Sequence, residues 1–219
     1  MQANHKGSCW VAAGILCGRN YGTIENVELK SCSVTVHRDL AQIGCLVGKT
    51  YADSNISKVS VKNSFAMSNG DVGMIAGAAE KAIVSDCEVE SCSVQYYAEK
   101  NNRCIGGVIG YLKSSTISSC SVTNTEFWYK GSSSKMHNAV LLVKHSSCPL
   151  QPAMGYIVGG ASVGSTLSAS SCTAQNNTKR FDGASSDDKN RITGSNNEGK
   201  AYFKKANGMA GAVSDSTVN

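Results

Sequence analysis

Residues 105–110 read IGGVIG and residues 117–122 read ISSCSV, and this order recurs along the chain: a glycine-bounded apolar segment precedes a short alternating stretch. Five glycine pairs, each with three residues between its members, open these units. The pairs are Gly14 and Gly18, Gly44 and Gly48, Gly73 and Gly77, Gly106 and Gly110, and Gly155 and Gly159. Their first members lie 30, 29, 33 and 49 residues apart. A recurrence near 30 residues is typical of stacked supersecondary units rather than of one globular core.

Behind each glycine segment, apolar residues recur at matched offsets, while the positions between them are mostly Ser, Glu, Lys or Asn. The first four units share the offsets and a weaker copy follows: Ile24, Val27, Leu29, Cys32 and Val34; Ile56, Val59, Val61, Ser64 and Ala66; Val84, Cys87, Val89, Cys92 and Val94; Ile117, Cys120, Val122, Thr125 and Phe127; and Ala169, Cys172 and Ala174. If each unit forms one coil of a parallel β-solenoid, matched residues stack about 4.8 Å apart. The change of parity between Leu29 and Cys32 predicts a bend or bulge where the strand turns a corner.

The composition agrees with an all-β protein that has many turns, because the 219 residues include 22 glycines and only two prolines and are rich in Ser, Thr and Val. We therefore predict an all-β, parallel β-solenoid, similar to a β-helix, of about five coils of roughly 30 residues. Residues 1–12 are expected to form a leader or cap and residues 13–174 the solenoid, with an insertion at about 128–153 before the last coil. Residues 175–219 are polar and are expected to dock on the solenoid or on a neighbouring subunit.

The segments 105–110 and 117–122 resemble the GLUG-motif repeats, in which a glycine-rich apolar segment leads through a turn into a strand of the Ile-Ser-x-Cys-Ser-Val type. The resemblance covers about residues 13–174. It implies a β-solenoid of a kind often found in secreted or surface-attached bacterial proteins and beside other domains. It implies no catalytic residues, and it places the chain outside the cell or on its surface.

Both sides of the glycine segment are apolar. Two neighbouring positions are apolar in every unit, Leu16, Leu46, Ile75, Val108 and Ile157 at the first and Cys17, Val47, Ala76, Ile109 and Val158 at the second. Since neighbouring residues on a strand point to opposite sides, one side faces the solenoid interior and the other needs a cover. The glycine columns would let that cover approach the backbone closely. The sequence leaves open whether the cover is the chain itself or a partner protein.

The ten cysteines are expected to be reduced. Five of them occupy inward columns, where a free thiol acts as a small apolar filler: Cys32, Cys87, Cys92, Cys120 and Cys172. No Cys-x-x-Cys occurs and the four histidines are scattered, so we expect neither a metal site nor a cofactor. Cys87 and Cys120 lie one coil apart, within the Cα range of a disulfide, although parallel Cβ directions disfavour that bond. Reduced thiols and the lack of a recognisable signal peptide favour an intracellular location, against the resemblance, so the location stays open.

The charged residues form neither a catalytic nor a nucleic-acid-binding pattern. Asp86, Glu88 and Glu90 alternate on one outward face, and with Lys58 and Lys62 one coil before they predict a solvated ladder of charge pairs. A polysaccharide-cleaving site needs acids that converge in a groove, so we expect no enzyme. The 21 Lys and Arg residues behind the net charge of +5 are spread along the chain, which argues against nucleic acid, and no apolar run is long enough to insert into a membrane.

Three functions are open. The first is a non-enzymatic structural or adhesive module that assembles with its own copies into an oligomer or fibre, or docks to a larger protein scaffold, because open solenoid ends expose strand edges. The second is a carbohydrate-binding or polysaccharide-processing β-helix protein with a glycan-binding aromatic platform of Tyr96, Tyr97, Trp128 and Tyr129. The third is an intracellular cytoskeletal or scaffold accessory protein, which reduced thiols favour.

Overall fold

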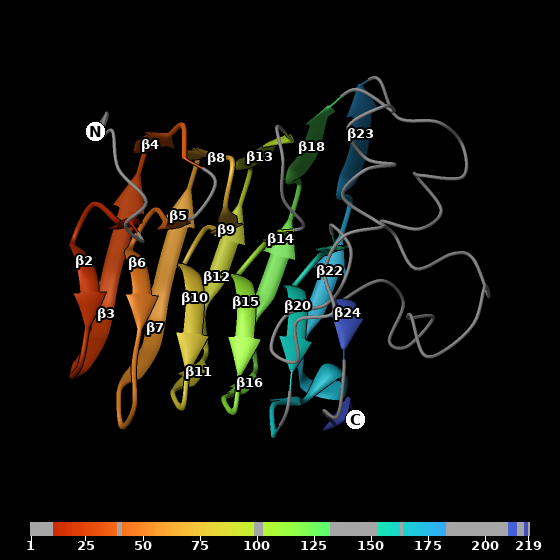
Figure 1. Cartoon of the computed structure of the whole chain (residues 1–219). Coiled ribbons are helices and arrows are strands. Elements are labelled where there is room, and N and C mark those ends of the chain that lie inside the picture. The colour runs from red at the N-terminus through yellow and green to blue at the C-terminus, as the bar shows by residue number, and fades with distance from the viewer. Residues whose placement is uncertain are drawn as a thin grey trace.

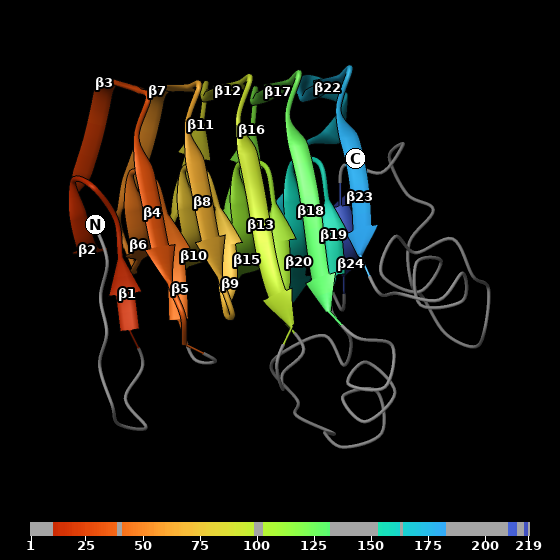
Figure 2. The same cartoon turned by 90° about the horizontal axis from the view of Figure 1, so that it is seen from above.

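Parallel strands stacked into coils make up the protein. A computed structural model describes residues 11–38, 41–98, 103–131, 153–162, 164–182, 210–213 and 217–218. The coils lie in one row, with the N-terminal strands at one end and the C-terminal strands at the other (Figure 1, Figure 2). Apart from one 3-10 turn, η1 (Ala169–Ser171), the elements of the described residues are strands that pair in parallel. The predicted all-β, parallel β-solenoid is confirmed.

Each coil passes through four sheets in turn. Sheet I holds the strands that lead to the first glycine of each pair: β1 (Val11–Ala13), β5 (Ala41–Gly44), β9 (Asp71–Gly73), β14 (Cys104–Gly106) and β19 (Ala153–Gly155). Sheet II holds the strands with the second glycine: β2 (Cys17–Asn20), β6 (Val47–Thr50), β10 (Ala76–Glu80), β15 (Ile109–Lys113), β20 (Val158–Ser162) and β24 (Ala210–Val213).

The alternating stretches form the other two sheets. Sheet III holds β3 (Thr23–Lys30), β7 (Asn55–Lys62), β11 (Ile83–Ser85), β12 (Glu88–Glu90), β16 (Thr116–Ser118), β17 (Ser121–Thr123), β21 (Thr166–Leu167), β22 (Thr173–Gln175) and β25 (Thr217–Val218). Sheet IV holds β4 (Ser33–Val36), β8 (Phe65–Ser68), β13 (Ser93–Ala98), β18 (Glu126–Gly131) and β23 (Thr178–Asp182).

Single residues in the left-handed region of φ make the corners. Between sheets III and IV they form one column, Ser31, Asn63, Ser91, Asn124 and Asn176, with φ from 48° to 54°. A second column bends sheet III itself: Asn26, Lys58, Asp86 and Ser119. A third lies between sheets II and III: Asp53, Lys81, Ser114 and Gly164. Since Ser31 stands between Leu29 and Cys32, the bend predicted from the parity change is confirmed.

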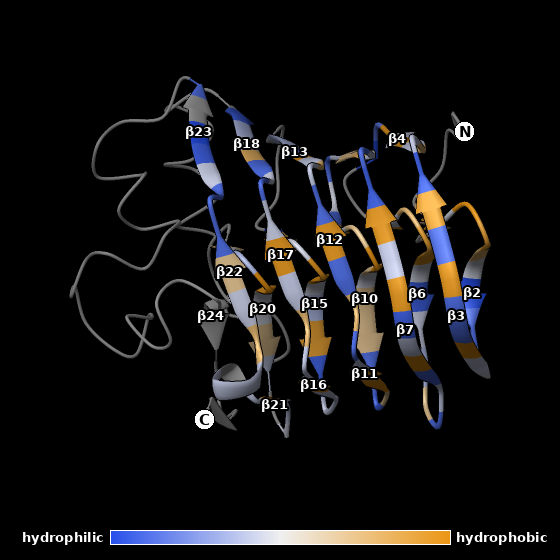
Figure 3. Ribbon diagram, turned by 180° about the vertical axis from the view of Figure 1, so that it is seen from behind, coloured by the Kyte–Doolittle hydropathy of each residue, from blue (hydrophilic) through white to orange (hydrophobic). Residues whose placement is uncertain are grey.

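The interior is one apolar core built from the matched columns. Along β7, Ile56, Val59 and Val61 are buried, whereas Lys58 between them is exposed. Figure 3 shows the same alternation of apolar and polar residues along β3 and β7. The period of two therefore changes phase at each left-handed residue, and the apolar side chains of the matched columns still point to the inside.

Sheets I and II pack directly on each other through the glycine columns. A β-carbon on Gly44 of sheet I would stand 2.7 Å from the Cα of Ala76 in the sheet II strand of the next coil. A β-carbon on Gly110 of sheet II would stand 2.7 Å from the nitrogen of Val72 in the sheet I strand of the preceding coil. The neighbouring aliphatic residues Leu46, Ile75, Val108 and Ile157 are fully buried. In these coils the cover left open by the sequence is therefore the chain's own backbone.

The solenoid extends beyond the expected boundaries. Residues 128–131, placed in the insertion by the sequence, belong to β18, which pairs with β13 and β23. The strands also continue past residue 174, because β23 extends sheet IV and β24 and β25 pair with β20 and β21. Residues 11 and 12 of the expected leader belong to β1, and residue 153 of the expected insertion begins β19. The rest of the leader, residues 1–10, and of the insertion, residues 132–152, lie outside the described residues. Within the described ranges, no helix is long and apolar enough to cross a membrane.

Candidate functional site

The four residues of the expected aromatic platform do not share one surface, and this interpretation is wrong. Tyr96 and Tyr129 are fully buried, and their rings pack against each other with centroids 5.4 Å apart. They continue the inward columns of Val94 and Phe127, because strands β13 and β18 run on beyond the repeat seen in the sequence. Only Tyr97, 44% exposed, and the half-buried Trp128 face outward.

Trp128 already has partners on its faces and its edge. The Lys130 Nζ lies 3.4 Å from the ring centroid and the Arg180 Cζ lies 4.1 Å from it. Trp128 Nε1 donates to Asp182 Oδ2 at 2.8 Å, and Arg180 Nε lies 3.2 Å from Asp182 Oδ1. Cation–π contacts and this hydrogen bond therefore tie β18 to β23. A ring so occupied offers little open face on which a sugar could stack.

The acidic ladder on sheet III is observed as charge pairing with one of the two expected lysines. Lys62 Nζ lies 3.1 Å from Glu88 and 2.9 Å from Glu90. Hydrogen bonds to Glu90 and Glu88 raise the pKa of Lys62 to about 12. Lys58 and Asp86 instead occupy the left-handed corner of sheet III. The ladder is thus a surface ion-pair network that aligns β12 with β7.

The cysteines of the described residues are free thiols. Three of them, Cys87, Cys120 and Cys172, form one buried column on successive coils, because Glu88, Ser121 and Thr173 pair in register beside them. A hydrogen bond from the Cys120 thiol lowers the pKa of Cys172 to about 7. Among the described residues, no group of three or more His, Cys, Asp and Glu side chains is arranged to hold a metal ion. The thiol column contributes apolar packing, and hydrogen bonding with Cys120 lowers the pKa of Cys87 as well.

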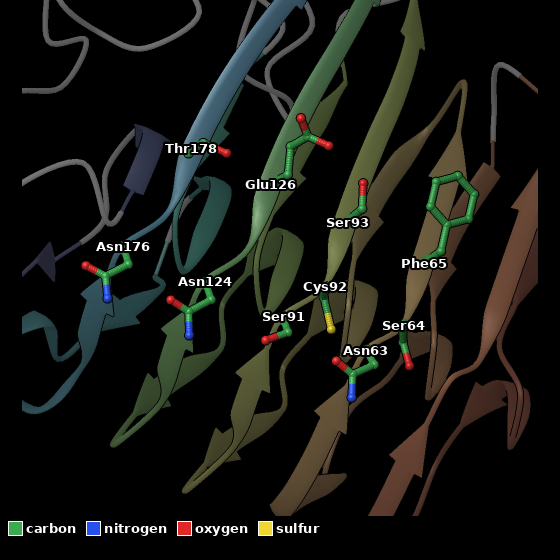
Figure 4. A pocket seen from close by; sticks show the side chains of 10 residues that line it. All are labelled: Asn63, Ser64, Phe65, Ser91, Cys92, Ser93, Asn124, Glu126, Asn176 and Thr178. Atoms are coloured by element: carbon green, nitrogen blue, oxygen red, sulfur yellow. The ribbon is translucent and has the colours of Figure 1, made fainter.

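A shallow groove follows the corner between sheets III and IV. Its hollow of about 490 Å³ is lined by two rows, the corner residues Asn63, Ser91, Asn124 and Asn176 and the outward residues Phe65, Ser93, Glu126 and Thr178, with Ser64 and Cys92 between them. Figure 4 shows each row following the axis of the solenoid from coil to coil. Among the described residues that line the groove, Glu126 is the single carboxylate, so these residues do not provide the paired acids of a glycosidase.

A second hollow, here called the charged cleft, opens between the start of sheet I and the end of sheet II. It measures about 350 Å³ and is lined by Ala12, Arg19, Gln42, Lys49, Tyr51, Asp71, Glu80, Arg103, Tyr111 and Lys113. Because the chain reverses between the two sheets, the first residues of a sheet I strand face the last residues of a sheet II strand. The cleft collects charged residues from four coils in this way.

Ion pairs order the walls of the charged cleft. Glu80 binds Lys49 at 2.9 Å and Lys113 at 2.8 Å, and hydrogen bonds from these two lysines lower its pKa to about 2. Asp71 is buried beside Arg103, with 3.9 Å between their charged atoms, and accepts a hydrogen bond from the Cys104 amide at 3.1 Å. Burial raises the pKa of Asp71, and the Arg103 guanidinium opposes that rise. Two carboxylates thus hold three cations in place.

Sequence reasoning missed the cleft, although a signal was present. Arg19 and Lys49 each follow the second glycine of their pair, and Glu80 and Lys113 each stand three residues after theirs. These positions interrupt an otherwise apolar segment with charge. Which of them meet could not be read without knowing that sheet I returns over sheet II.

No family model, curated protein or solved structure matches the chain. The ends of the solenoid and its two hollows are the structural features that bear on its function.

Proposed function

We propose that the chain is a non-enzymatic structural module whose copies assemble end to end, first coil to last coil, into an oligomer or fibre. The observation that carries the proposal is the exposure of apolar side chains on the first coil. Leu16 is 52% exposed and Ile15 is 41% exposed, although their counterparts one coil later, Leu46 and Cys45, are fully buried. Apolar side chains gathered where solvent reaches them are typical of a contact surface.

Strand edges at the two ends support the same contact. Among the described residues, β1, β2, β3 and β4 pair on one side only, and at the other end β19, β22, β23, β24 and β25 do so. An edge of a parallel sheet offers its N–H and C=O groups to a further strand at about 4.8 Å. Both ends carry edges of all four sheets, so the first coil of one copy can pair with the last coil of another. A head-to-tail contact repeated along one axis produces an open fibre.

The apolar columns also match across such a contact. Half-buried Ile24, Val27 and Leu29 begin three inward columns on the first coil. At the other end, the column of Ile24 runs through Leu167 to the position of Val218, and the columns of Val27 and Leu29 end at Cys172 and Ala174. Stacking the two ends would bury Ile24, Val27 and Leu29 as the interior coils bury their counterparts. The resemblance to GLUG-motif repeats agrees with a structural or adhesive role, at a cell surface or on a larger scaffold.

Sedimentation velocity and electron microscopy of the wild type and of Leu16→Glu test this proposal. We expect the wild type to form concentration-dependent oligomers or fibres and Leu16→Glu to shift the population to monomers, because a charge at the end contact must be desolvated. Ile83→Glu is the matched control, since Ile83 is 55% exposed on sheet III, away from the first coil. A wild type that stays monomeric, or equal disruption by Ile83→Glu, would overturn end-to-end assembly.

A further inference from the structure

The charged cleft has the dimensions of a small-molecule site. Its volume of about 350 Å³ falls within the range of about 300–1,000 Å³ that ligand pockets occupy. Strands from both sheet I and sheet II line it, so a bound molecule would contact two walls. The walls are also ordered in advance, because Glu80 is held by Lys49 and Lys113 and Asp71 lies beside Arg103. A pre-organised polar wall lowers the cost of binding.

The charges of the cleft select an anion. Arg19, Lys49, Arg103 and Lys113 face two carboxylates, Asp71 and Glu80, which leaves an excess of two positive charges. The two lysines share Glu80, and Arg103 pairs with Asp71. Arg19 is exposed at the first coil and forms no ion pair within the described ranges. Its guanidinium therefore offers a free fork that fits a carboxylate in bidentate geometry.

The hydrogen-bond acceptors in the cleft favour a ligand that carries hydroxyl groups beside its anionic group. Asp71, Glu80 and the Gln42 side chain provide oxygens, and the lysines that bind Glu80 retain further N–H donors. A multiply charged anion such as phosphate would meet repulsion from the two carboxylates. A molecule with one carboxylate and several hydroxyls satisfies both kinds of wall group. Tyr51 closes one side, its ring stacked on Tyr21 with centroids 4.6 Å apart and Lys49 Nζ 4.5 Å from its centroid.

We propose that the charged cleft binds an acidic sugar, a uronic acid residue, whose carboxylate is held by Arg19 and whose hydroxyls are held by Glu80, Asp71 and the lysines. This site differs from the aromatic platform expected from the sequence, and it does not depend on end-to-end assembly. In this proposal the solenoid binds an acidic sugar non-covalently at the cleft, and no covalent bond forms or breaks.

Calorimetric titration of the full chain with glucuronate and with galacturonate tests the proposal, with glucose, galactose and inorganic phosphate as comparison ligands. We expect saturable binding of at least one uronate and at least about tenfold weaker binding of the neutral sugars, which corresponds to about 1.4 kcal/mol. Binding should also weaken as the ionic strength rises, because the contact with Arg19 is partly exposed. If phosphate bound as tightly as the uronates, the cleft would be a general anion site, and the sugar assignment would be overturned.

Two arginine variants separate the cleft from the rest of the surface. Arg19→Gln should weaken uronate binding at least about tenfold while leaving the thermal unfolding of the chain unchanged, because the side chain is exposed and forms no ion pair with another described residue. Arg180→Gln removes the same charge from the outer face of sheet IV and should leave uronate binding as it is. No saturable uronate binding by the wild type, or equal losses in both variants, would contradict the proposal.

Discussion

Gly110 in β15 lies against Val72 in β9 so closely that a β-carbon on Gly110 would stand 2.7 Å from the Val72 nitrogen and 2.5 Å from the Gly77 oxygen. Both neighbours are backbone atoms, which cannot swing aside as a flexible side chain would. The glycine pairs are therefore a condition of the fold, since they set the distance at which sheet II rests on sheet I.

Gly110→Ala is expected to lower the free energy of unfolding by about 3 kcal/mol or more, because two sheets would have to separate locally to admit one methyl group. Urea unfolding followed by circular dichroism measures the change. Gly22→Ala is the control: a β-carbon at Gly22 meets nothing within 4 Å, so this change should stay within about 1 kcal/mol of the wild type. Similar losses for the two variants would mean that the close contact is not what Gly110 provides.

Asn124 tests the corner between sheets III and IV. Its φ is 50°, and its exposed side chain stands in the groove. Asn124→Val should cost about 1–2 kcal/mol of unfolding free energy, because a β-branched residue is strained in the left-handed region. Asn124→Gly keeps the same backbone without strain and should stay close to the wild type. If denaturant midpoints for Val and Gly coincide, backbone strain does not decide the corner.

Lys179 places an ammonium group in an inward column. It pairs in register with Phe127, its Nζ donates to the Met154 carbonyl at 3.4 Å and it lies 4.3 Å from the Tyr156 ring centroid. Burial lowers the pKa of Lys179 from 10.5 to about 8. The unfolded chain therefore keeps a proton that the folded chain has released between pH 8 and 10.5, so this lysine makes stability rise with pH across that window.

Replacing that lysine should remove the effect. Lys179→Met is expected to raise the unfolding free energy at pH 7 by about 1–3 kcal/mol and to abolish this part of the rise between pH 8 and 10.5. Denaturant unfolding of both proteins at several pH values gives the difference, which cancels the titration of thiols and tyrosines. Lys30→Met, at an exposed lysine on sheet III, should leave the pH dependence as it is. A wild-type profile that matches that of Lys179→Met would show that burial does not lower the pKa of Lys179.

Cys120 is expected to act as an apolar filler that also lowers the pKa of Cys172. Since Val59 occupies the same column, Cys120→Val should change the unfolding free energy by less than about 1.5 kcal/mol. Without the Cys120 thiol as donor, the pKa of Cys172 should rise from about 7 toward its usual range. Thiolate absorbance in the ultraviolet, recorded against pH, measures this shift. An unchanged titration curve would mean that Cys120 does not bond to Cys172.

The columns of the solenoid could be predicted because they repeat, and several local features could not. Ile24, Val27 and Leu29 define offsets that later coils obey, so the strands and the corner at Ser31 follow from pattern alone. Tyr96 and Tyr129 lie beyond the offsets that repeat in the sequence, so the repeat alone does not place them inside, although each stands two residues after a core residue. Lys179 gave no signal, since a charged residue predicts an outward position.

The charged cleft could not be predicted from the sequence. Arg19, Glu80 and Arg103 lie on different coils, and each looks like an ordinary surface charge in its own segment. Only the return of sheet I over sheet II brings them to one place. Contacts along a column repeat and can be extrapolated, whereas contacts between two faces depend on how far each corner turns.

The segment that connects sheet IV to sheet I has no fixed length. The chain crosses it in two residues between β8 and β9, in five between β13 and β14, and in 21 between β18 and β19, yet β19 still pairs with β14 in register. A coil can therefore acquire a long excursion at this point without disturbing its neighbours. For a protein engineer, this makes the solenoid a display frame in which guest sequences could be grafted at one edge, coil by coil, at intervals of about 4.8 Å.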